Sequence, residues 1–116
     1  MYDSNNIFAK ILRKEISCKS IYEDEKVLFF HDINPRANIH VLAIPKIDVV
    51  DFNDFIIKSD PDTIKYFFTK IHQVVQELGL EKLGYRLITN NGKEAGQEVP
   101  HFHVHILGGK NLKELK

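Results

Sequence analysis

The sequence predicts a single α+β domain, residues 1–116, with a mainly antiparallel sheet of about five strands, one long helix and a short N-terminal helix. Two observations predict this class. One long amphipathic stripe, typical of a helix, stands among several short segments rich in β-branched and aromatic residues. The chain has 116 residues, a length that supports one hydrophobic core. Because the strands largely follow one another instead of alternating with helices, antiparallel pairing is favoured over a parallel sheet.

The first predicted element is a short amphipathic helix close to the start of the chain. Ser4 or Asn5 can cap its N-terminus. Its apolar residues recur at spacings of one, three and four, as one face of a helix requires. These residues are Ile7, Phe8, Ile11 and Leu12.

A hairpin is predicted next, from two extended segments at residues 20–23 and 26–32 that a short charged turn separates. Their β-branched and aromatic residues are typical of strands. Residues 34–38 predict a loop, because Pro35 has a fixed φ and disfavours helical geometry in the residue before it.

Three further strands are predicted, at residues 39–44, 85–90 and 102–107. The first of them is almost entirely apolar and ends at Pro45, which indicates a buried strand. The polar, glycine-containing loop 91–99 joins the last two.

The long helix is predicted to begin at Asp60, a good N-cap, with Pro61 at the first helical position and Asp62 complementing the helix dipole. Gly79 supplies the C-terminal stop. Its apolar residues form one continuous stripe that should lie across the sheet. They are Ile64, Phe67, Phe68, Ile71, Val74, Val75 and Leu78.

Composition excludes several classes of protein. Lys and Arg number 16 and Asp and Glu number 16, so the net charge is zero, which disfavours a nucleic-acid partner that needs a basic surface. The single cysteine, Cys18, excludes a disulfide framework and suggests a reducing compartment. No signal peptide is evident, and no apolar run approaches the roughly 20 residues that span a bilayer. We therefore expect a cytoplasmic protein with no membrane partner.

Three histidines alternate with apolar residues in the last predicted strand. Because strand side chains point alternately to opposite faces, His101, His103 and His105 should share one face, about 6.6 Å apart, while the other face joins the core. Three buried imidazoles in a row are costly packing material, so the pattern indicates chemistry. The residues on the core face are Phe102, Val104 and Ile106.

Two kinds of chemistry use such histidines. A metal site needs three or four ligands that converge on one point, and the outer pair would lie roughly 13 Å apart. We therefore expect no required cofactor and no metal site beyond incidental zinc at the histidines. The other use is catalysis at phosphorus, in which one neutral imidazole attacks and its neighbours hold phosphate oxygens or protonate the leaving group. Loop 90–98 runs directly into the triad strand and can supply backbone donors.

Residues 101–107, with the sequence HFHVHIL, match the histidine triad pattern of alternating histidine and apolar residues. The chain resembles the histidine triad (HIT) superfamily, and in particular its Hint branch of nucleoside phosphoramidases, from Asn6 to about Gly109. The resemblance implies a HIT-like fold. Other segments in register are Ile7-Phe8, Phe30-His31-Asp32-Ile33, His40, Ala43-Ile44-Pro45-Lys46, Gly84-Tyr85-Arg86 and Gly108-Gly109.

The resemblance implies a role for each of four histidines. His103 corresponds to the nucleophile that forms a covalent nucleotidyl-histidine intermediate with AMP or GMP, which water then hydrolyses. His105 would contact the phosphate and assist protonation of the leaving group. His101 would hold the phosphate or orient its neighbours. His40 corresponds to a fourth histidine behind the nucleophile, where it would set the tautomer of His103.

Further residues fall on the family's nucleotide-binding positions. By strand alternation Phe30 and Asp32 share a face, so they could offer a ring to the base and a carboxylate to the ribose hydroxyls. Ile7, Phe8, Ile11 and Ile33 would complete an apolar slot for the base. The phosphate and ribose positions correspond to Asn90, Gly96, Gln97 and Glu98.

The resemblance implies cleavage of the P–N bond of adenosine or guanosine 5′-phosphoramidates. It also implies a homodimer formed through the long helix and the strand at 85–89. Glu98 departs from the serine often found in animal members, and the short tail, residues 111–116, leaves the preferred leaving group open. Two alternatives remain: hydrolysis of dinucleoside polyphosphates, as in the Fhit branch, and a nucleotide-binding scaffold with little turnover.

Overall fold

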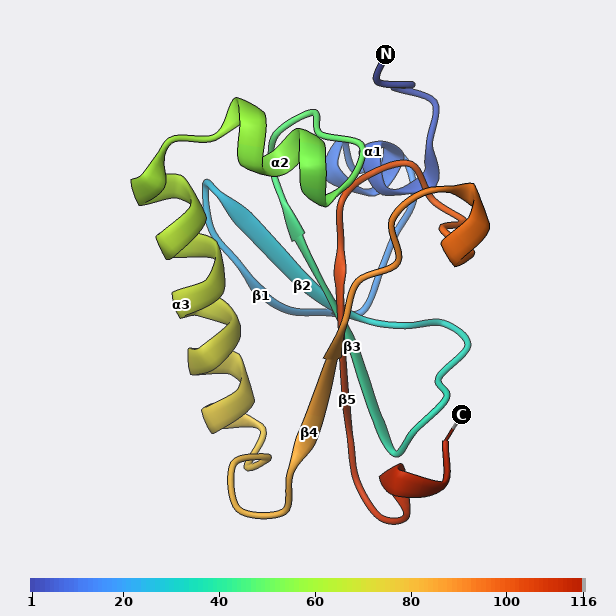
Figure 1. Cartoon of the computed structure of the whole chain (residues 1–116), viewed down its shortest axis with the longest axis vertical. Coiled ribbons are helices and arrows are strands. Elements are labelled where there is room, and N and C mark those ends of the chain that lie inside the picture. The colour runs from blue at the N-terminus through green and yellow to red at the C-terminus, as the bar shows by residue number, and fades with distance from the viewer. Residues whose placement is uncertain (116) are drawn as a thin grey trace.

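A computed structural model describes residues 1–115 and confirms the α+β class (Figure 1). Five strands form one sheet in the order β1-β2-β3-β5-β4, and every neighbouring pair is antiparallel. The elements in chain order are α1 (Ile7–Leu12), β1 (Ser20–Glu23), β2 (Val27–His31), β3 (Ile39–Pro45), α2 (Phe52–Lys58), α3 (Pro61–Glu77), β4 (Tyr85–Ile88), the 3-10 turn η1 (Lys93–Ala95), β5 (Val104–Gly108) and the 3-10 turn η2 (Leu112–Glu114).

The two faces of the sheet bury different clusters. One face packs against α2 and α3 and carries Phe29, Val41 and Ile106, all of them buried. The opposite face packs against α1 and carries Phe30 and Leu42. Because side chains alternate along each strand, the histidines of β3 and β5 lie on the α1 face.

The two predicted helices form where the sequence places them. The Asp60 side chain accepts a hydrogen bond of 2.8 Å from the Thr63 amide and caps α3, which begins at Pro61 as predicted. In α1 the cap is Asn6, not Ser4 or Asn5, and its side chain accepts from the Ala9 amide at 2.9 Å. Helix α3 runs along one side of the sheet (Figure 1).

Helix α2 was not predicted. The sequence offers little evidence for this helix. Asp51 caps it by accepting from the amide of Asp54, but Phe55 is its only buried residue, so it has no apolar stripe. The Phe55 ring stacks on Phe102, with centroids 4.7 Å apart, and packs edge-on against Phe67. This single aromatic contact, made far along the chain, seats the helix against the core.

The last strand begins later than predicted, at Val104 instead of Phe102. Val49 lies beyond the end of β3, and its carbonyl accepts a hydrogen bond of 2.9 Å from the Phe102 amide. Two of the three triad histidines, His101 and His103, therefore stand on the irregular backbone that leads into β5.

A side-chain cluster ties the β1–β2 hairpin to α3. The Asp24 carboxylate accepts hydrogen bonds from the hydroxyls of Tyr22 and Tyr66 and from the Val27 amide. Burial works against ionisation here, but these bonds outweigh it and lower the pKa of Asp24 to about 2. Within residues 1–115, no helix is long and apolar enough to cross a membrane.

Candidate active site

His103 is held by a backbone carbonyl that decides which of its ring nitrogens is free. Its Nδ1 lies 2.7 Å from the carbonyl oxygen of His101. A carbonyl only accepts, so Nδ1 carries the proton and Nε2 keeps a lone pair. The ring is buried, with Phe8 edge-on at 5.0 Å between centroids and His105 at the same separation. The sequence-predicted nucleophile therefore has the tautomer that attack requires.

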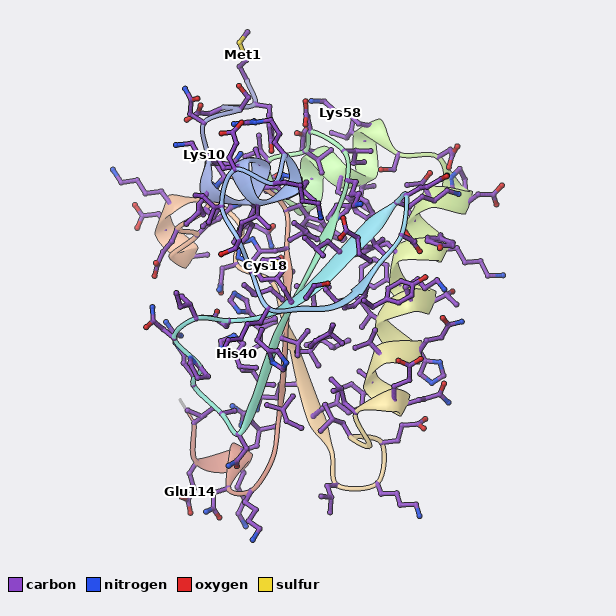
Figure 2. All side chains as sticks on the ribbon, turned by 180° about the vertical axis from the view of Figure 1, so that it is seen from behind. Met1, Lys10, Cys18, His40, Lys58 and Glu114 are labelled. Atoms are coloured by element: carbon purple, nitrogen blue, oxygen red, sulfur yellow. The ribbon has the colours of Figure 1, made fainter. Side chains whose placement is uncertain are left out.

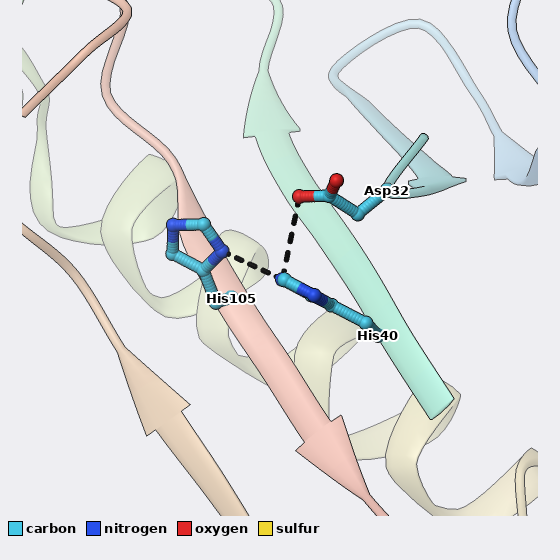
Figure 3. Close-up of side chains that lie close together, drawn as sticks. All are labelled: Asp32, His40 and His105. Carbon is cyan, nitrogen blue, oxygen red and sulfur yellow. Dashed lines mark hydrogen bonds and ion pairs between the residues drawn. The ribbon is translucent and has the colours of Figure 1, made fainter. Parts of the chain in front are cut away.

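His105 has the opposite tautomer, and the backbone decides this too. The Arg36 amide donates to Nδ1 of His40 at 3.1 Å, so the His40 proton sits on Nε2. That Nε2 lies 2.9 Å from Nδ1 of His105 and donates to it (Figure 3). His105 then carries its own proton on Nε2. The site presents one bare nitrogen, on His103, beside one N–H donor, on His105.

The sequence-based role for His40 was wrong in its partner: His40 contacts His105, not His103. The cause is the strand register, in which Leu42 of β3 stands opposite His105 of β5. His40 is two residues along from Leu42 and therefore occupies the diagonal position to His105. Figure 2 shows it near the middle of the molecule, and it is almost fully buried.

Asp32 joins this arrangement just after the end of β2. Its Oδ2 lies 3.4 Å from Nε2 of His40, and its Oδ1 accepts a 2.8 Å bond from the Asn34 amide. The carboxylate is thus positioned by the turn that follows it and lies beside Nε2 of His40, whose proton is donated to His105. Its predicted contact with a ribose remains a prediction.

His101 is fully buried, and both of its ring nitrogens are engaged within the chain. Nε2 lies 2.8 Å from the carbonyl of Pro45 and donates to it, so Nδ1 accepts from the hydroxyl of Tyr2 at 2.6 Å. No ring nitrogen is left for a phosphate, so of the two predicted roles this geometry favours orienting neighbours. Tyr2 was not predicted, and nothing in the sequence pattern pointed to it.

Burial keeps all four histidines neutral at the site. It is the largest cause that lowers the pKa of His101 and of His103, and it also lowers the pKa of His40 against the attraction of Asp32. Burial together with the neighbouring His103 and His40 lowers the pKa of His105 to about 4. Neutral imidazoles are what the two tautomers described above require.

These lowered pKa values predict that the protein loses stability as the pH falls. An unfolded chain protonates its histidines below about pH 6.5, whereas the folded site resists protonation. Stability from this source is complete above that value and is lost as the pH falls toward the folded-state pKa values. We expect a lower urea midpoint at about pH 5 than at about pH 7.5, measured by circular dichroism. His105→Gln should reduce this difference, and an unchanged pH dependence in that variant would contradict the assignment.

Asp32, His40 and His105 are also the residues that could hold a metal, since one ligand atom of each lies within 4.8 Å of the others. Zinc requires nitrogen lone pairs that point at the ion. Here the Arg36 amide occupies Nδ1 of His40, so the nitrogen that faces the cluster carries a proton. The hydrogen-bonded arrangement does not fit zinc unless that proton moves, whereas it fits a neutral His40 that donates to His105.

The loop before the triad is closed by Gln97. Its Oε1 accepts from the amide of Gly92 at 2.8 Å, and its Nε2 donates to the carbonyls of Val50 and Val99 at 2.7 and 3.1 Å. The side chain predicted to meet a phosphate thus holds the loop instead. Gly96 has the left-handed backbone, φ 78°, that lets the loop turn here.

The remaining predicted phosphate and ribose residues are accessible. Asn90 is half-buried, and Glu98 is exposed. Burial is the largest influence on the pKa of His103 and lowers it. The carboxylates of Asp32 and Glu98 both oppose this by raising the pKa. The predicted place of Glu98 at the phosphate remains a prediction.

The predicted base-binding residues divide into two groups. Phe8, Ile11 and Phe30 are buried against one another in the core of the α1 face, with the Phe8 and Phe30 rings edge-on at 5.6 Å. Ile7 is 47% exposed and Ile33 is 91% exposed. Two of these five side chains are thus exposed and three are buried, and of the buried three Phe8 contacts the His103 ring.

A family model described as HIT domain matches residues 13–112. An uncharacterized HIT-like protein of Rickettsia prowazekii is 51% identical over 112 residues, which cover 97% of this chain and 93% of that protein. A 14 kDa zinc-binding protein of Zea mays is 44% identical over 113 residues, covering 95% of this chain and 86% of that protein.

Solved structures share the fold. A histidine triad protein from Clostridium difficile has a TM-score of 0.87 and 38% identity, with 100% of both chains covered. A HIT family hydrolase from Clostridium thermocellum has a TM-score of 0.82 and 37% identity, with 95% of each chain covered. A histidine triad nucleotide-binding protein from Candida albicans has a TM-score of 0.78 and 30% identity, covering 88% of this chain and 73% of that one.

Proposed function

The chain belongs to the HIT domain family, and from that premise we propose that it is a nucleotide-binding hydrolase that cleaves the P–N bond of adenosine or guanosine 5′-phosphoramidates. The observation that carries the proposal is the pair of opposite tautomers. Nε2 of His103 is a bare nucleophile, and His105 beside it presents an N–H donor. A hydrolase and a nucleotide-binding protein among its structural neighbours support the same chemistry.

The proposed reaction has two steps at phosphorus. In the first step Nε2 of His103 forms a bond to phosphorus while the P–N bond of the substrate breaks. The electron pair of the P–N bond leaves with the amine, which takes a proton from solvent. Water then attacks phosphorus, the P–Nε2 bond breaks, the electron pair returns to His103, and the proton from water goes to solvent. The His101 carbonyl stabilises the positive charge that develops on the His103 ring through Nδ1–H.

His105 is assigned a narrower role than general acid. With a pKa of about 4 it is neutral near pH 7, and its Nδ1 is occupied by His40. Its Nε2–H is therefore placed to donate to a phosphoryl oxygen, where negative charge increases as the histidine attacks. The proposed scheme uses no metal or other cofactor. This choice is supported by the proton on Nε2 of His40, which occupies the nitrogen that a metal ion would need.

The test is the product and the intermediate. The protein mixed with adenosine 5′-phosphoramidate should release AMP and ammonia, and a sample quenched in base should carry an AMP adduct on the peptide that contains His103, seen by mass spectrometry. Turnover of dinucleoside polyphosphates without turnover of phosphoramidates would favour the polyphosphate hydrolase instead. Tight AMP binding with no turnover of either substrate would favour the scaffold.

We further propose that the protein forms a symmetric homodimer through β4 and α3. Strand β4 is an edge of the sheet, with Tyr85 and Leu87 exposed, and Phe68 of α3 is 37% exposed. The apolar surplus on α3 is smaller than the sequence suggested, because Phe67 and Ile71, with Val74 and Val75, are buried within the chain itself. Edge pairing would satisfy the free backbone groups of β4 and cover its apolar side chains.

The dimer predicts a molecular mass near twice 13.5 kDa by light scattering at micromolar concentration. Leu87→Lys, which places a charge on the exposed face of β4, should shift the protein to monomer. Ile57→Lys is the matched control, because Ile57 is an exposed apolar residue of α2, away from this edge. A wild-type protein that stays monomeric would contradict the proposal.

A further inference from the structure

We propose that Tyr2 is a positioning residue for the nucleophile: through His101 it holds the carbonyl that sets the tautomer of His103. The proposal rests on the proposed function for its kinetic consequence. Its structural part, a tautomer, can be measured whether or not that function is correct. Tyr2 lies outside residues 13–112, the part of the chain that the family model matches.

The first step is the Tyr2–His101 contact. The hydroxyl lies 2.6 Å from Nδ1 of His101, and the two rings meet edge-on with centroids 5.6 Å apart. His101 has no solvent exposure, so a nitrogen without a partner there would be costly. Because the Pro45 carbonyl takes the proton at Nε2, Tyr2 is the donor that satisfies Nδ1.

The second step connects His101 to the nucleophile through the backbone. The carbonyl of His101 is the acceptor for Nδ1–H of His103, at 2.7 Å. This stretch precedes β5 and is outside the sheet ladder. One backbone bond fixes the peptide that carries this carbonyl, because its Phe102 amide donates to the Val49 carbonyl at 2.9 Å. The His101 side chain, bonded to Tyr2 and to the Pro45 carbonyl, is the second anchor and fixes the residue on the other side of that peptide.

The third step is that Tyr2 is itself held in place. It precedes a turn in which the Asp3 carbonyl accepts from the Asn6 side chain at 2.7 Å, and Asn6 in turn caps α1. The guanidinium of Arg13 donates to the carbonyl of Ser4 at 2.8 Å and ties the same turn to the end of the helix. Helix α1 also supplies Phe8, whose ring meets His103 edge-on. The segment before α1 thus contacts His101 while the helix contacts His103.

Tyr2→Phe removes the hydroxyl and keeps the ring. Nδ1 of His101 is then left without a donor, the ring and its carbonyl gain freedom, and His103 divides its proton between its two nitrogens. The productive tautomer of His103 is then only partly populated, and its ring is less well fixed. Together these changes should lower kcat for phosphoramidate hydrolysis about tenfold. KM should change by less than about twofold, because Tyr2 has no proposed contact with the nucleotide.

The experiment reads the tautomers directly and the kinetics beside them. Protein with ¹⁵N-labelled histidine is examined by long-range proton–nitrogen NMR, which separates the two neutral tautomers. In wild type, His103 should be protonated on Nδ1 and His101 on Nε2. In Tyr2→Phe the His103 signals should become those of a mixture. Tyr66→Phe is the matched control, since it also removes a tyrosine hydroxyl bond, to Asp24 on the other side of the sheet.

Each outcome decides the proposal. A shifted His103 tautomer and a reduced kcat in Tyr2→Phe, with neither change in Tyr66→Phe, establish it. If Tyr2→Phe lowers the melting temperature but leaves the His103 tautomer and kcat as in wild type, Tyr2 is only structural and the proposal is overturned. If wild type turns over no phosphoramidate, the proposed function fails, while the NMR comparison still confirms or overturns the positioning of His103.

Discussion

Replacing His103 by alanine is expected to reduce single-turnover release of amine from adenosine 5′-phosphoramidate by at least about a thousandfold. The reason is that His103 alone offers a bare ring nitrogen beside the donor. His101 uses both of its nitrogens internally, and His40 and His105 share a hydrogen bond with each other. Rapid-quench measurement of AMP formation checks the rate, and the adduct should be absent.

The control for this experiment is His31→Ala, which removes an exposed imidazole at the end of β2. It should keep the wild-type rate. Binding of AMP to His103→Ala, measured by calorimetry, should remain within about tenfold of wild type, because the nucleophile contributes to the reacting state more than to ground-state affinity. A wild-type rate of amine release in His103→Ala would end the proposed mechanism.

His40→Phe is expected to lower kcat by about a hundredfold with a smaller change in KM. The substitution removes the N–H that His105 accepts at Nδ1, so His105 can turn its bare nitrogen toward the phosphate, where a lone pair repels the phosphoryl oxygens. The phenyl ring keeps most of the volume of this buried position. Steady-state kinetics with adenosine 5′-phosphoramidate measure the effect.

Two comparison variants separate this role from packing. His40→Gln retains an N–H donor and should lose less activity than His40→Phe. His72→Phe changes an exposed histidine on α3 and should leave kcat unaltered. If His40→Gln and His40→Phe lose activity equally, the donated hydrogen bond is not what matters at this position.

Much of the site could be predicted because its chemistry depends on local patterns. Alternation places His103 and His105 on one face of the chain, and the structure brings their rings to 5.0 Å. The cap and stripe of α3 depend on neighbours within a few residues, so the helix begins at Pro61 as predicted. The loop before the triad likewise turns at Gly96, where a left-handed residue is needed.

Other features escaped prediction because they depend on contacts between distant residues. The partner of His40 follows from the register of β3 against β5, which pairs Leu42 with His105 and so places His40 diagonally to His105. Phe55 seats α2 by stacking on Phe102. The burial of Phe8, Ile11 and Phe30 against one another likewise depends on α1 meeting the sheet, and their predicted contact with a base remains a prediction.

The sequence by itself determined the α+β class, the family and the residue types of the site, since periodicity, caps and the histidine pattern are properties of short stretches of chain. Only the tertiary structure decided which nitrogen of each histidine carries a proton. A ring nitrogen takes its role from the group that faces it. Here those groups are the Arg36 amide and the carbonyls of Pro45 and His101, together with the hydroxyl of Tyr2. Folding brings them to the imidazoles, and none of them forms part of the triad motif's side-chain pattern.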